Sequence, residues 1–151
     1  MGLAMDGALE IRRLGWQDLD ILCAVPEGLF DFPVDAAQAA AFLADPGHEI
    51  VAAFTDGLMV GMATGTVLLH PDKAPCMFVN EVGVREDYRQ RGIGSLIMER
   101  FLEVARGRGC EGVWLGTEAD NGSARALYLK VGGRETEGLV IYDWDGVMDE
   151  A

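Results

Sequence analysis

The alternation of apolar and polar positions in the first third of the chain predicts one strand followed by two helices. Residues 8–14 (ALEIRRL) alternate like a half-buried strand, and residues 16–25 (WQDLDILCAV) carry apolar side chains at helical spacing. Residues 35–44 (DAAQAAAFLA) are alanine-rich and begin with Asp35, a residue type that caps helix N-termini. Residues 26–33 (PEGLFDFP), bounded by two prolines, form the predicted loop between the helices.

Three strands and a long helix are predicted for the middle of the chain. Residues 48–55 and 58–69 flank Asp56-Gly57, a dipeptide that strongly signals a tight hairpin. Residues 76–84 (CMFVNEVGV) are typical of a further strand. Apolar positions then recur at helical spacing over residues 93–107, which predicts a helix that ends at a glycine.

The last third of the chain predicts a strand, a helix and a final strand. Residues 112–117 (GVWLGT) form a predicted buried strand, residues 121–131 (NGSARALYLKV) a helix, and residues 139–145 (LVIYDWD) an alternating last strand. No repeat, low-complexity tract or linker interrupts the pattern, and 151 residues is a usual length for one domain. We therefore predict a single α/β domain over residues 1–151.

The charge balance limits the class of partner. Twelve basic residues against 25 acidic residues give a net charge of −13, which disfavours nucleic acid and anionic membranes as partners. The acidic residues either keep the protein soluble or collect cationic ligands, and the sequence leaves both interpretations open. Because no apolar run has membrane-spanning length and the N-terminal residues lack a secretory pattern, we expect a cytoplasmic protein.

Cysteine and histidine usage disfavours disulfides and metal sites. Cys23, Cys76 and Cys110 are far apart, odd in number and without CxxC spacing, so we expect reduced core thiols. His48 and His70 lie at the predicted ends of strands, and no metal site is expected.

A glycine-spaced turn between a predicted strand and a predicted helix is the strongest chemical signal. Residues 85–95 (REDYRQRGIGS) contain Arg85, Arg89 and Arg91, three of the twelve basic residues. The free N–H groups and the dipole at a helix start favour an anion, and glycine lets a phosphate approach the backbone. A nucleoside-triphosphate loop would need a lysine after its second glycine, and a dinucleotide fingerprint would need a small residue where Ile97 stands, so both are disfavoured.

Three segments in this order carry a family resemblance. Residues 89–94 (RQRGIG) fit the pattern Arg or Gln, two residues, Gly, one residue, Gly or Ala. Together with residues 79–84 (VNEVGV) and 121–133 (NGSARALYLKVGG), this turn resembles the GCN5-related N-acetyltransferase (GNAT) superfamily. The resemblance implies the GNAT fold, an α/β (α+β) architecture. In it, about four helices flank a central, mixed, mostly antiparallel twisted sheet of six to seven strands. It also implies acetyl-CoA as the co-substrate.

The resemblance assigns CoA contacts residue by residue. The strand end would bind the pantetheine amides, the turn would bind the pyrophosphate through backbone N–H groups, and Asn121 would cap its helix or bond the CoA chain. Arg89 and Arg91 are expected to contact phosphates, whereas Arg85 is not favoured for that role. The implied CoA-binding residues are Val82, Gly83, Val84, Arg89, Gln90, Arg91, Gly92, Ile93, Gly94, Ser95, Asn121 and Tyr128.

Acetyl transfer to an amine needs a base for the ammonium proton and an acid for the leaving thiolate. Glu81 is the predicted base, because it interrupts an apolar strand where burial would raise its pKa. The alternative is a rim carboxylate paired with an arginine. The resemblance implies Tyr128 as the acid, although a core tyrosine would fit the same position. Cys76 and Cys110 lack a predicted histidine partner, so we expect direct attack without an acetyl-enzyme.

The acceptor depends on loops, where a narrower resemblance applies. Residues 29–54, residues 81–84 (EVGV) with the glycine turn, residues 116–133 and the acidic-aromatic ending at 141–145 (IYDWD) are similar to type I aminoglycoside 3-N-acetyltransferases. These have an aspartate where this chain has Glu81. This implies an aminoglycoside acetylated on its 3-amino group. The two loop phenylalanines either wrap a substrate or pack into the core. The predicted substrate-binding residues are Phe30, Asp31, Phe32, Glu81, Glu118, Asp120 and Asp143.

Other functions stay open at this point. A protein N-terminus, a lysine side chain or a polyamine is an alternative acceptor, although the loop at residues 26–33 looks too bulky for an extended peptide. A non-catalytic acetyl-CoA sensor is a further alternative. The family also leaves open a homodimer formed through sheet edges or the last strands.

Overall fold

A five-stranded mixed sheet forms the centre of the fold. The computed structural model describes residues 8–146, in which the strands follow the order β1-β2-β3-β4-β5 across the sheet. Neighbouring strands from β1 to β4 are antiparallel, and β5 is parallel to β4. Their bounds are Leu9–Arg13 (β1), His48–Thr55 (β2), Leu58–Leu68 (β3), Cys76–Val84 (β4) and Gly112–Trp114 (β5).

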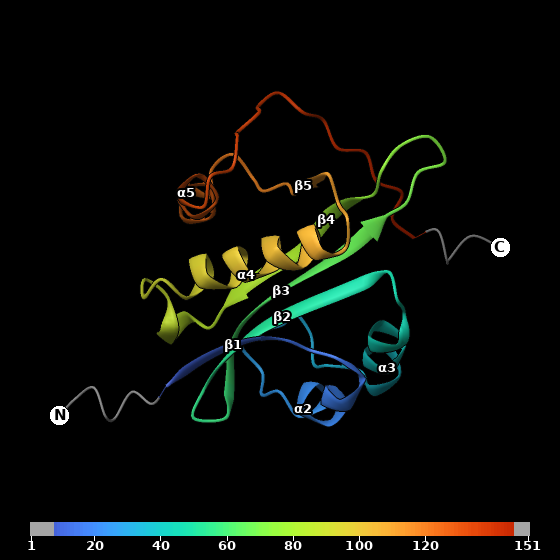
Figure 1. Cartoon of the computed structure of the whole chain (residues 1–151). Coiled ribbons are helices and arrows are strands. Elements are labelled where there is room, and N and C mark those ends of the chain that lie inside the picture. Colours follow the sequence, from blue (N-terminus) through green and yellow to red (C-terminus); the bar gives the residue numbers. More distant parts are fainter. Residues whose placement is uncertain (1–7, 147–151) are drawn as a thin grey trace.

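Helices cover both faces of this sheet (Figure 1). α4 crosses one face with α5 beyond it, and α2 and α3 lie on the other face. The helices are α2 (Leu19–Cys23), α3 (Ala36–Ala44), α4 (Ile93–Gly107) and α5 (Gly122–Lys130), with short 3-10 turns at Trp16–Asp18 and Glu86–Tyr88.

Strand alternation divides the apolar core into two layers. Val51 of β2 packs in the cluster that contains Phe101 of α4, whereas the next residue back, Ile50, packs in the cluster beneath α2 and α3. α4 approaches the sheet closely because β3 carries glycine there. A Cβ atom at Gly65 would lie 2.6 Å from Cζ of Phe101, too close for any side chain without displacement.

The local sequence signals fold as predicted in most of the chain. Asp56 and Gly57 adopt left-handed φ angles of 51° and 81° and connect β2 to β3. Asp35 caps α3 by accepting a hydrogen bond of 2.9 Å from the backbone N–H of Gln38. The first strand, the hairpin, the fourth strand, and the helices predicted from residues 35, 93 and 121 are confirmed.

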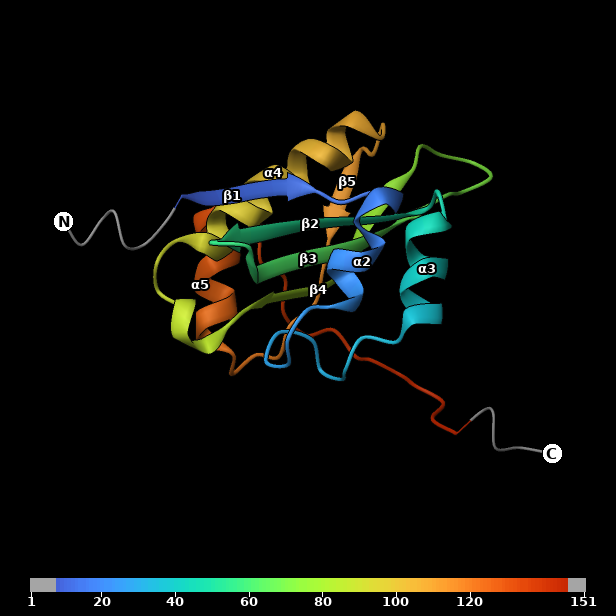
Figure 2. The ribbon, with the colours of Figure 1, turned by 90° about the horizontal axis from the view of Figure 1, so that it is seen from below.

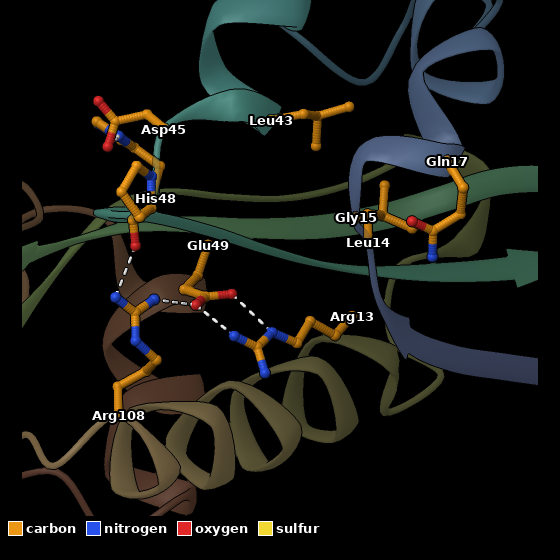
Figure 3. Close-up of a pocket in the computed structure, with 10 residues that line it drawn as sticks. Arg13, Leu14, Gly15, Gln17, Leu43, Asp45, His48, Glu49 and Arg108 are labelled. Carbon is orange, nitrogen blue, oxygen red and sulfur yellow. Dashed lines mark hydrogen bonds and ion pairs between the residues drawn. The ribbon is translucent and has the colours of Figure 1, made fainter.

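A buried carboxylate ties the sheet to the end of α4 (Figure 3). Glu49 of β2 accepts hydrogen bonds of 2.8 and 2.6 Å from the guanidinium of Arg13 in β1. Arg108, directly after α4, contacts the same carboxylate and donates to the carbonyl oxygen of Pro46 at 2.6 Å. Because both arginines are engaged by protein acceptors, we interpret this hollow of about 520 Å³ as a structural corner.

The C-terminal side of the sheet differs from the prediction. The sheet has five strands rather than six to seven, because residues 139–145 form no strand. Leu139 and Trp144 in this segment are 80% and 77% exposed, and Figure 2 shows it running outward from the body of the fold. Alternation indicates a strand-like pattern but does not supply the neighbouring strand that must complete its hydrogen bonds.

The predicted buried strand at residues 112–117 is also wrong in length and burial. β5 ends at Trp114, whose side chain is 55% exposed. The reason is its position, since β5 is an edge strand with β4 as its one neighbour in the described sheet.

Two further expectations concern thiols and membranes. Cys23, Cys76 and Cys110 are free thiols, as expected, but each is partly exposed rather than in the core. Among residues 8–146, no helix combines the length and apolar character needed to cross a membrane.

Candidate active site

A bulge in β4 separates a paired half of the strand from an open half. Thr64 of β3 lies opposite Glu81, whereas Gly65 lies opposite Val79, so Asn80 is an extra residue in β4. The Asn80 side chain is held by Thr66, with 3.0 Å between Asn80 Nδ2 and Thr66 Oγ1.

Beyond this bulge β4 has an unpaired edge. β5 pairs with β4 only along Cys76–Phe78, so residues 79–84 have no strand neighbour on that side within the described chain. Unpaired N–H and C=O groups seek another hydrogen-bonding partner, and an extended ligand with amide groups fits such an edge. The predicted pantetheine segment, Val82, Gly83 and Val84, lies in this open half.

The glycine turn that follows forms an anion cradle at the start of α4. Gly92 is the N-cap of α4 with a left-handed φ of 82°, and it offers no side chain to the helix terminus. The first helical hydrogen bond runs from Leu96 N–H to the Gly92 carbonyl at 3.2 Å, so the N–H groups of residues 93–95 have no intrahelical partner. Gln90 also has a positive φ of 65°. Free N–H groups and the helix dipole together favour a bound phosphate.

The three arginines near the cradle have different environments. Arg89 donates through Nε to the Val84 carbonyl at 3.0 Å, and Arg91 donates to the Asp87 carbonyl at 3.0 Å with its guanidinium over the Tyr88 ring. Both side chains are exposed beside the turn. Arg85 instead turns away and bonds only backbone carbonyls in the described chain, at 2.7 to 2.8 Å.

Glu81 lies in an acidic cleft between β4 and the segment that joins α2 to α3. The cleft has a volume of about 700 Å³. Burial by the cleft walls and, second, the negative charge of Asp31 raise the pKa of Glu81, even though its side chain reaches solvent. The cleft is lined by carboxylates, a histidine and aromatic rings, among them Phe30, Asp31, Phe32, Asp35, Asp45, His48 and Glu81.

Tyr128 lies half-buried on α5, and burial raises the pKa of its phenol. A raised phenol pKa keeps the group protonated at neutral pH, as a proton donor must be.

Asn121 caps α5, because its side-chain oxygen accepts from the Ala124 N–H at 3.1 Å, which leaves the amide NH₂ as a donor for another group. α5 is seated against the cradle, since a Cβ atom at Gly94 would lie 3.1 Å from Leu127 Cδ2.

The predicted substrate-binding residues separate into two groups. Phe30, Asp31, Phe32 and Glu81 line the same cleft; Phe30 also packs against the core, whereas Phe32 is 80% exposed. Glu118 and Asp120 lie in the loop before α5, and Asp143 lies in the exposed C-terminal segment. None of these three lines the cleft that contains Glu81.

Sequence reasoning missed Asn80 and Thr66, which shape the bulge. The only available signal was a polar residue beside Glu81 in a strand, because a bulge depends on pairing between strands rather than on spacing within one.

The expectation that no histidine lies near the cysteines is wrong for Cys76. Its Sγ lies 3.6 Å from Nε2 of His70, because the loop after β3 folds back over the start of β4. Cys76 is five residues from Glu81 along β4, roughly 16 Å away. This thiol is therefore remote from the cleft. Within residues 8–146, no group of three or more side chains could hold a metal ion.

The bulged strand has an open edge, the helix start that follows it has free N–H groups, and a cleft lined in part by carboxylates lies beside them. Residues 13–133 match the acetyltransferase (GNAT) family. The chain belongs to this family. Its GNAT fold is α+β, with a mixed five-stranded sheet and four α-helices in the described residues.

Relatives of this GNAT protein have acceptors of two kinds. N-alpha-acetyltransferase RimI of Mycobacterium tuberculosis is 35% identical over 113 residues, which cover 73% of this chain and 69% of the relative. Aminoglycoside N(6′)-acetyltransferase type 1 of Salmonella typhimurium is 25% identical over 146 residues, which cover 89% and 97%.

A solved structure supports the fold and names a CoA compound. AAC(6′)-Iy in complex with the bisubstrate analogue CoA-S-monomethyl-acetylneamine superposes with a TM-score of 0.76 at 20% identity, covering 91% of this chain and 99% of that one. These aminoglycoside relatives are named for the 6′ position, not for the 3-amino position that the sequence resemblance implied.

Proposed function

We propose that this GNAT protein transfers the acetyl group of acetyl-CoA to an amine of a small cationic acceptor, with an aminoglycoside as the favoured acceptor. The observation that carries the proposal is the cleft beside the open edge of β4, whose largely apolar lining includes the carboxylates of Asp31, Asp35, Asp45 and Glu81. Clustered carboxylates attract a polyamine and disfavour an anionic acceptor. Aminoglycoside relatives, and a structural neighbour bound to a CoA analogue, support the same class.

The co-substrate would lie along the open edge and the cradle. The backbone of Val82, Gly83 and Val84 would bond the pantetheine arm, and the N–H groups from Gln90 to Ser95 would hold the pyrophosphate. Arg89 and Arg91 would add charge near the phosphates, since both are exposed beside the turn. The free NH₂ of Asn121 would donate to the CoA chain.

The reaction then follows from two groups with raised pKa values. Glu81 would take the proton of the acceptor ammonium, directly or through a water molecule, so that the neutral amine attacks the thioester carbonyl. A backbone N–H of residues 82–84 would polarise that carbonyl. As the C–N bond forms and the C–S bond breaks, Tyr128 would donate its proton to the departing thiolate. The attacking nitrogen would lose its second proton, which restores the Tyr128 phenol through solvent, and Glu81 would release the first proton to solvent before the next turnover. No acetyl-enzyme is required.

The position acetylated on an aminoglycoside is part of the proposal. The sequence resemblance favours the 3-amino group, whereas the relatives named above favour the 6′-amino group. Structure determination of the acetylated product by NMR would distinguish the two positions.

A second candidate is the α-amine of a protein N-terminus. The 35% identity with N-alpha-acetyltransferase RimI favours it. The loop at residues 26–33 argues against it, because Phe30, Asp31 and Phe32 line the cleft that an extended peptide would have to enter.

The test is mass spectrometry of the full chain with acetyl-CoA and a panel of acceptors. The panel contains 2-deoxystreptamine aminoglycosides, spermidine, a lysine peptide and a peptide with a free N-terminal alanine. We expect one acetyl group to be added to an aminoglycoside, with Glu81→Gln reducing the rate about 100-fold while acetyl-CoA affinity is kept. Acetylation of the N-terminal peptide alone would establish the second candidate. Binding of acetyl-CoA with no acceptor modified would favour a sensor.

We also propose that the chain forms a homodimer. Five large apolar side chains are exposed in a segment that runs outward: Leu139, Val140, Ile141, Tyr142 and Trp144. Within residues 8–146, β5 has a strand neighbour on one side only. A second copy of this segment and edge would cover such side chains.

A further inference from the structure

Arg85 is the residue directly after the open half of β4, and its guanidinium is fixed by backbone carbonyls. Nε donates to the Met59 carbonyl at 2.8 Å, Nη1 to the Glu27 carbonyl at 2.7 Å, and Nη2 to the Pro26 carbonyl at 2.8 Å. The Arg85 backbone N–H also donates to the Val60 carbonyl at 2.8 Å. One side chain therefore joins the end of β4, the start of β3 and the segment after α2.

The backbone of that segment is shaped to meet the guanidinium. Gly28 has a φ of 108°, which glycine adopts readily and other residues rarely do, and a Cβ atom there would lie 3.0 Å from Arg85 Nη1. The next residue, Leu29, packs over β4, since a Cβ atom at Gly83 would lie 3.4 Å from the Leu29 carbonyl oxygen. Residues 26–29 therefore pack against the last residues of β4.

The residues directly after 26–29 line the acceptor cleft. Phe30 and Asp31 are the next two residues in the chain, and both line the cleft with Glu81. Burial and, second, the charge of Asp31 raise the pKa of Glu81, so the position of Asp31 affects the predicted base. Only residues 28 and 29 separate the Glu27 carbonyl that Arg85 binds from Phe30 in the cleft, so the backbone between them has little conformational freedom.

We propose that Arg85 is a positioning residue for the acceptor: its three carbonyl contacts hold residues 26–29 on β4 and thereby place Phe30 and Asp31 in the cleft. This inference rests on the proposed function, because the acceptor is the ligand of that cleft. It separates Arg85 from Arg89 and Arg91, which remain beside the phosphate cradle. Acceptor affinity, rather than CoA affinity, depends on Arg85.

Arg85→Lys is the informative variant. Lysine keeps the charge, but a single ammonium on a different stem cannot reproduce the planar fork that meets three carbonyls in different directions. Arg100→Lys is the matched control. Arg100 lies on α4 and makes one exposed contact of 3.5 Å with Glu103, so the same substitution there should change none of the measured quantities.

Steady-state kinetics and calorimetry form the first test. We expect Arg85→Lys to raise KM for the acceptor about tenfold or more with a smaller change in kcat, because hydrogen bonds to a charged group are lost from the loop. The Kd of acetyl-CoA should stay within about twofold. The pKa of Glu81 should fall as Asp31 moves away, so the acid limb of kcat/KM should move to lower pH. The other titratable residues that line the cleft with Glu81 are Asp35, Asp45 and His48.

Hydrogen exchange provides a readout that does not depend on catalysis. Amides of residues 27–34 should exchange about tenfold faster in Arg85→Lys, with no change at β4 residues 77–79. If Arg85→Lys does not fold, Gly28→Ala disturbs the same contact from the loop side and should give the same local change.

Three results would overturn the inference. These are a weaker acetyl-CoA affinity with an unchanged acceptor KM, unchanged exchange in residues 27–34, and equal losses in every kinetic parameter together with faster exchange throughout the chain. If the wild-type protein acetylates no acceptor, the proposed function fails. The exchange and acetyl-CoA measurements then still decide whether Arg85 holds the loop or binds the phosphates.

Discussion

Asp31 and Glu81 line one cleft, and the negative charge of Asp31 disfavours ionisation of Glu81. Burial and the Asp31 charge raise the pKa of Glu81, so a higher pH is needed to ionise the base. Activity should therefore be lost as the pH falls through this raised pKa. Asp31→Asn removes the neighbouring charge, so the pKa of Glu81 falls and activity should persist to lower pH.

The measurement for this prediction is the pH dependence of kcat/KM for the best acceptor. Asp72→Asn is the control, because Asp72 lies in the loop before β4 and pairs with Lys73. Its acid limb should match that of the wild type. An acid limb that stays in place in Asp31→Asn, or moves to higher pH, would contradict the assignment of Glu81 as the base.

Tyr128 provides the second prediction at the scale of a residue. Burial raises the pKa of its phenol, so the phenol stays protonated at neutral pH and can donate its proton to the thiolate. Tyr128→Phe keeps the ring and should lower kcat about 100-fold while the Kd of acetyl-CoA is nearly unchanged. Tyr142→Phe, at an exposed position, should leave kcat unchanged. A tenfold loss of acetyl-CoA affinity without a loss of kcat would make Tyr128 a packing residue.

At the scale of an element, α4 offers a matched pair of glycines. Gly92 has a φ of 82°, so Gly92→Ala strains the backbone and should lower the free energy of unfolding by about 1 kcal/mol. It should also weaken acetyl-CoA binding, because the turn that orients the cradle N–H groups changes. Gly107, the last residue of α4, has no such φ and open space around it, so Gly107→Ala should be neutral or stabilise by up to about 1 kcal/mol.

Thermal unfolding with and without acetyl-CoA measures both effects. We expect a lower melting temperature for Gly92→Ala and an unchanged or higher one for Gly107→Ala, together with a smaller stabilisation of Gly92→Ala by acetyl-CoA. Equal stabilisation of both variants by acetyl-CoA would place the phosphates elsewhere.

Elements with a local signal were predictable, and elements that need a distant partner were not. The helix from Ile93 follows from apolar spacing after a glycine-spaced turn, and the hairpin follows from Asp56-Gly57. The bulge at Asn80 was not predictable, because it depends on how β4 pairs with β3. The final strand was predicted from alternation and is absent, because alternation does not show which edge would receive it.

At the scale of the whole molecule, the exposed segment leads to a prediction of oligomeric state. Aromatic side chains bury about 150 to 250 Å² each, so Tyr142 and Trp144 of this segment would together bury about 300 to 500 Å² per copy, and three aliphatic side chains would add to that. A standard interface buries about 800 Å² per partner. Light scattering should therefore give twice the mass of one chain, and Ile141→Lys should shift it toward one chain. Leu69→Lys, which is similarly exposed outside the segment, is the control. A monomer at all concentrations would contradict the homodimer.

The sequence by itself determined the cradle, the candidate base and the order of most elements, because these depend on residues close together in the chain. Residues 89–94 and Glu81 are recognisable from local pattern alone. Only the tertiary structure showed that Asp31 and Glu81 line one cleft, that Glu118 and Asp120 lie outside it, and that Arg85 bonds residues 26 and 27. Such contacts join residues about fifty or more positions apart, and their geometry depends on how the whole sheet is assembled.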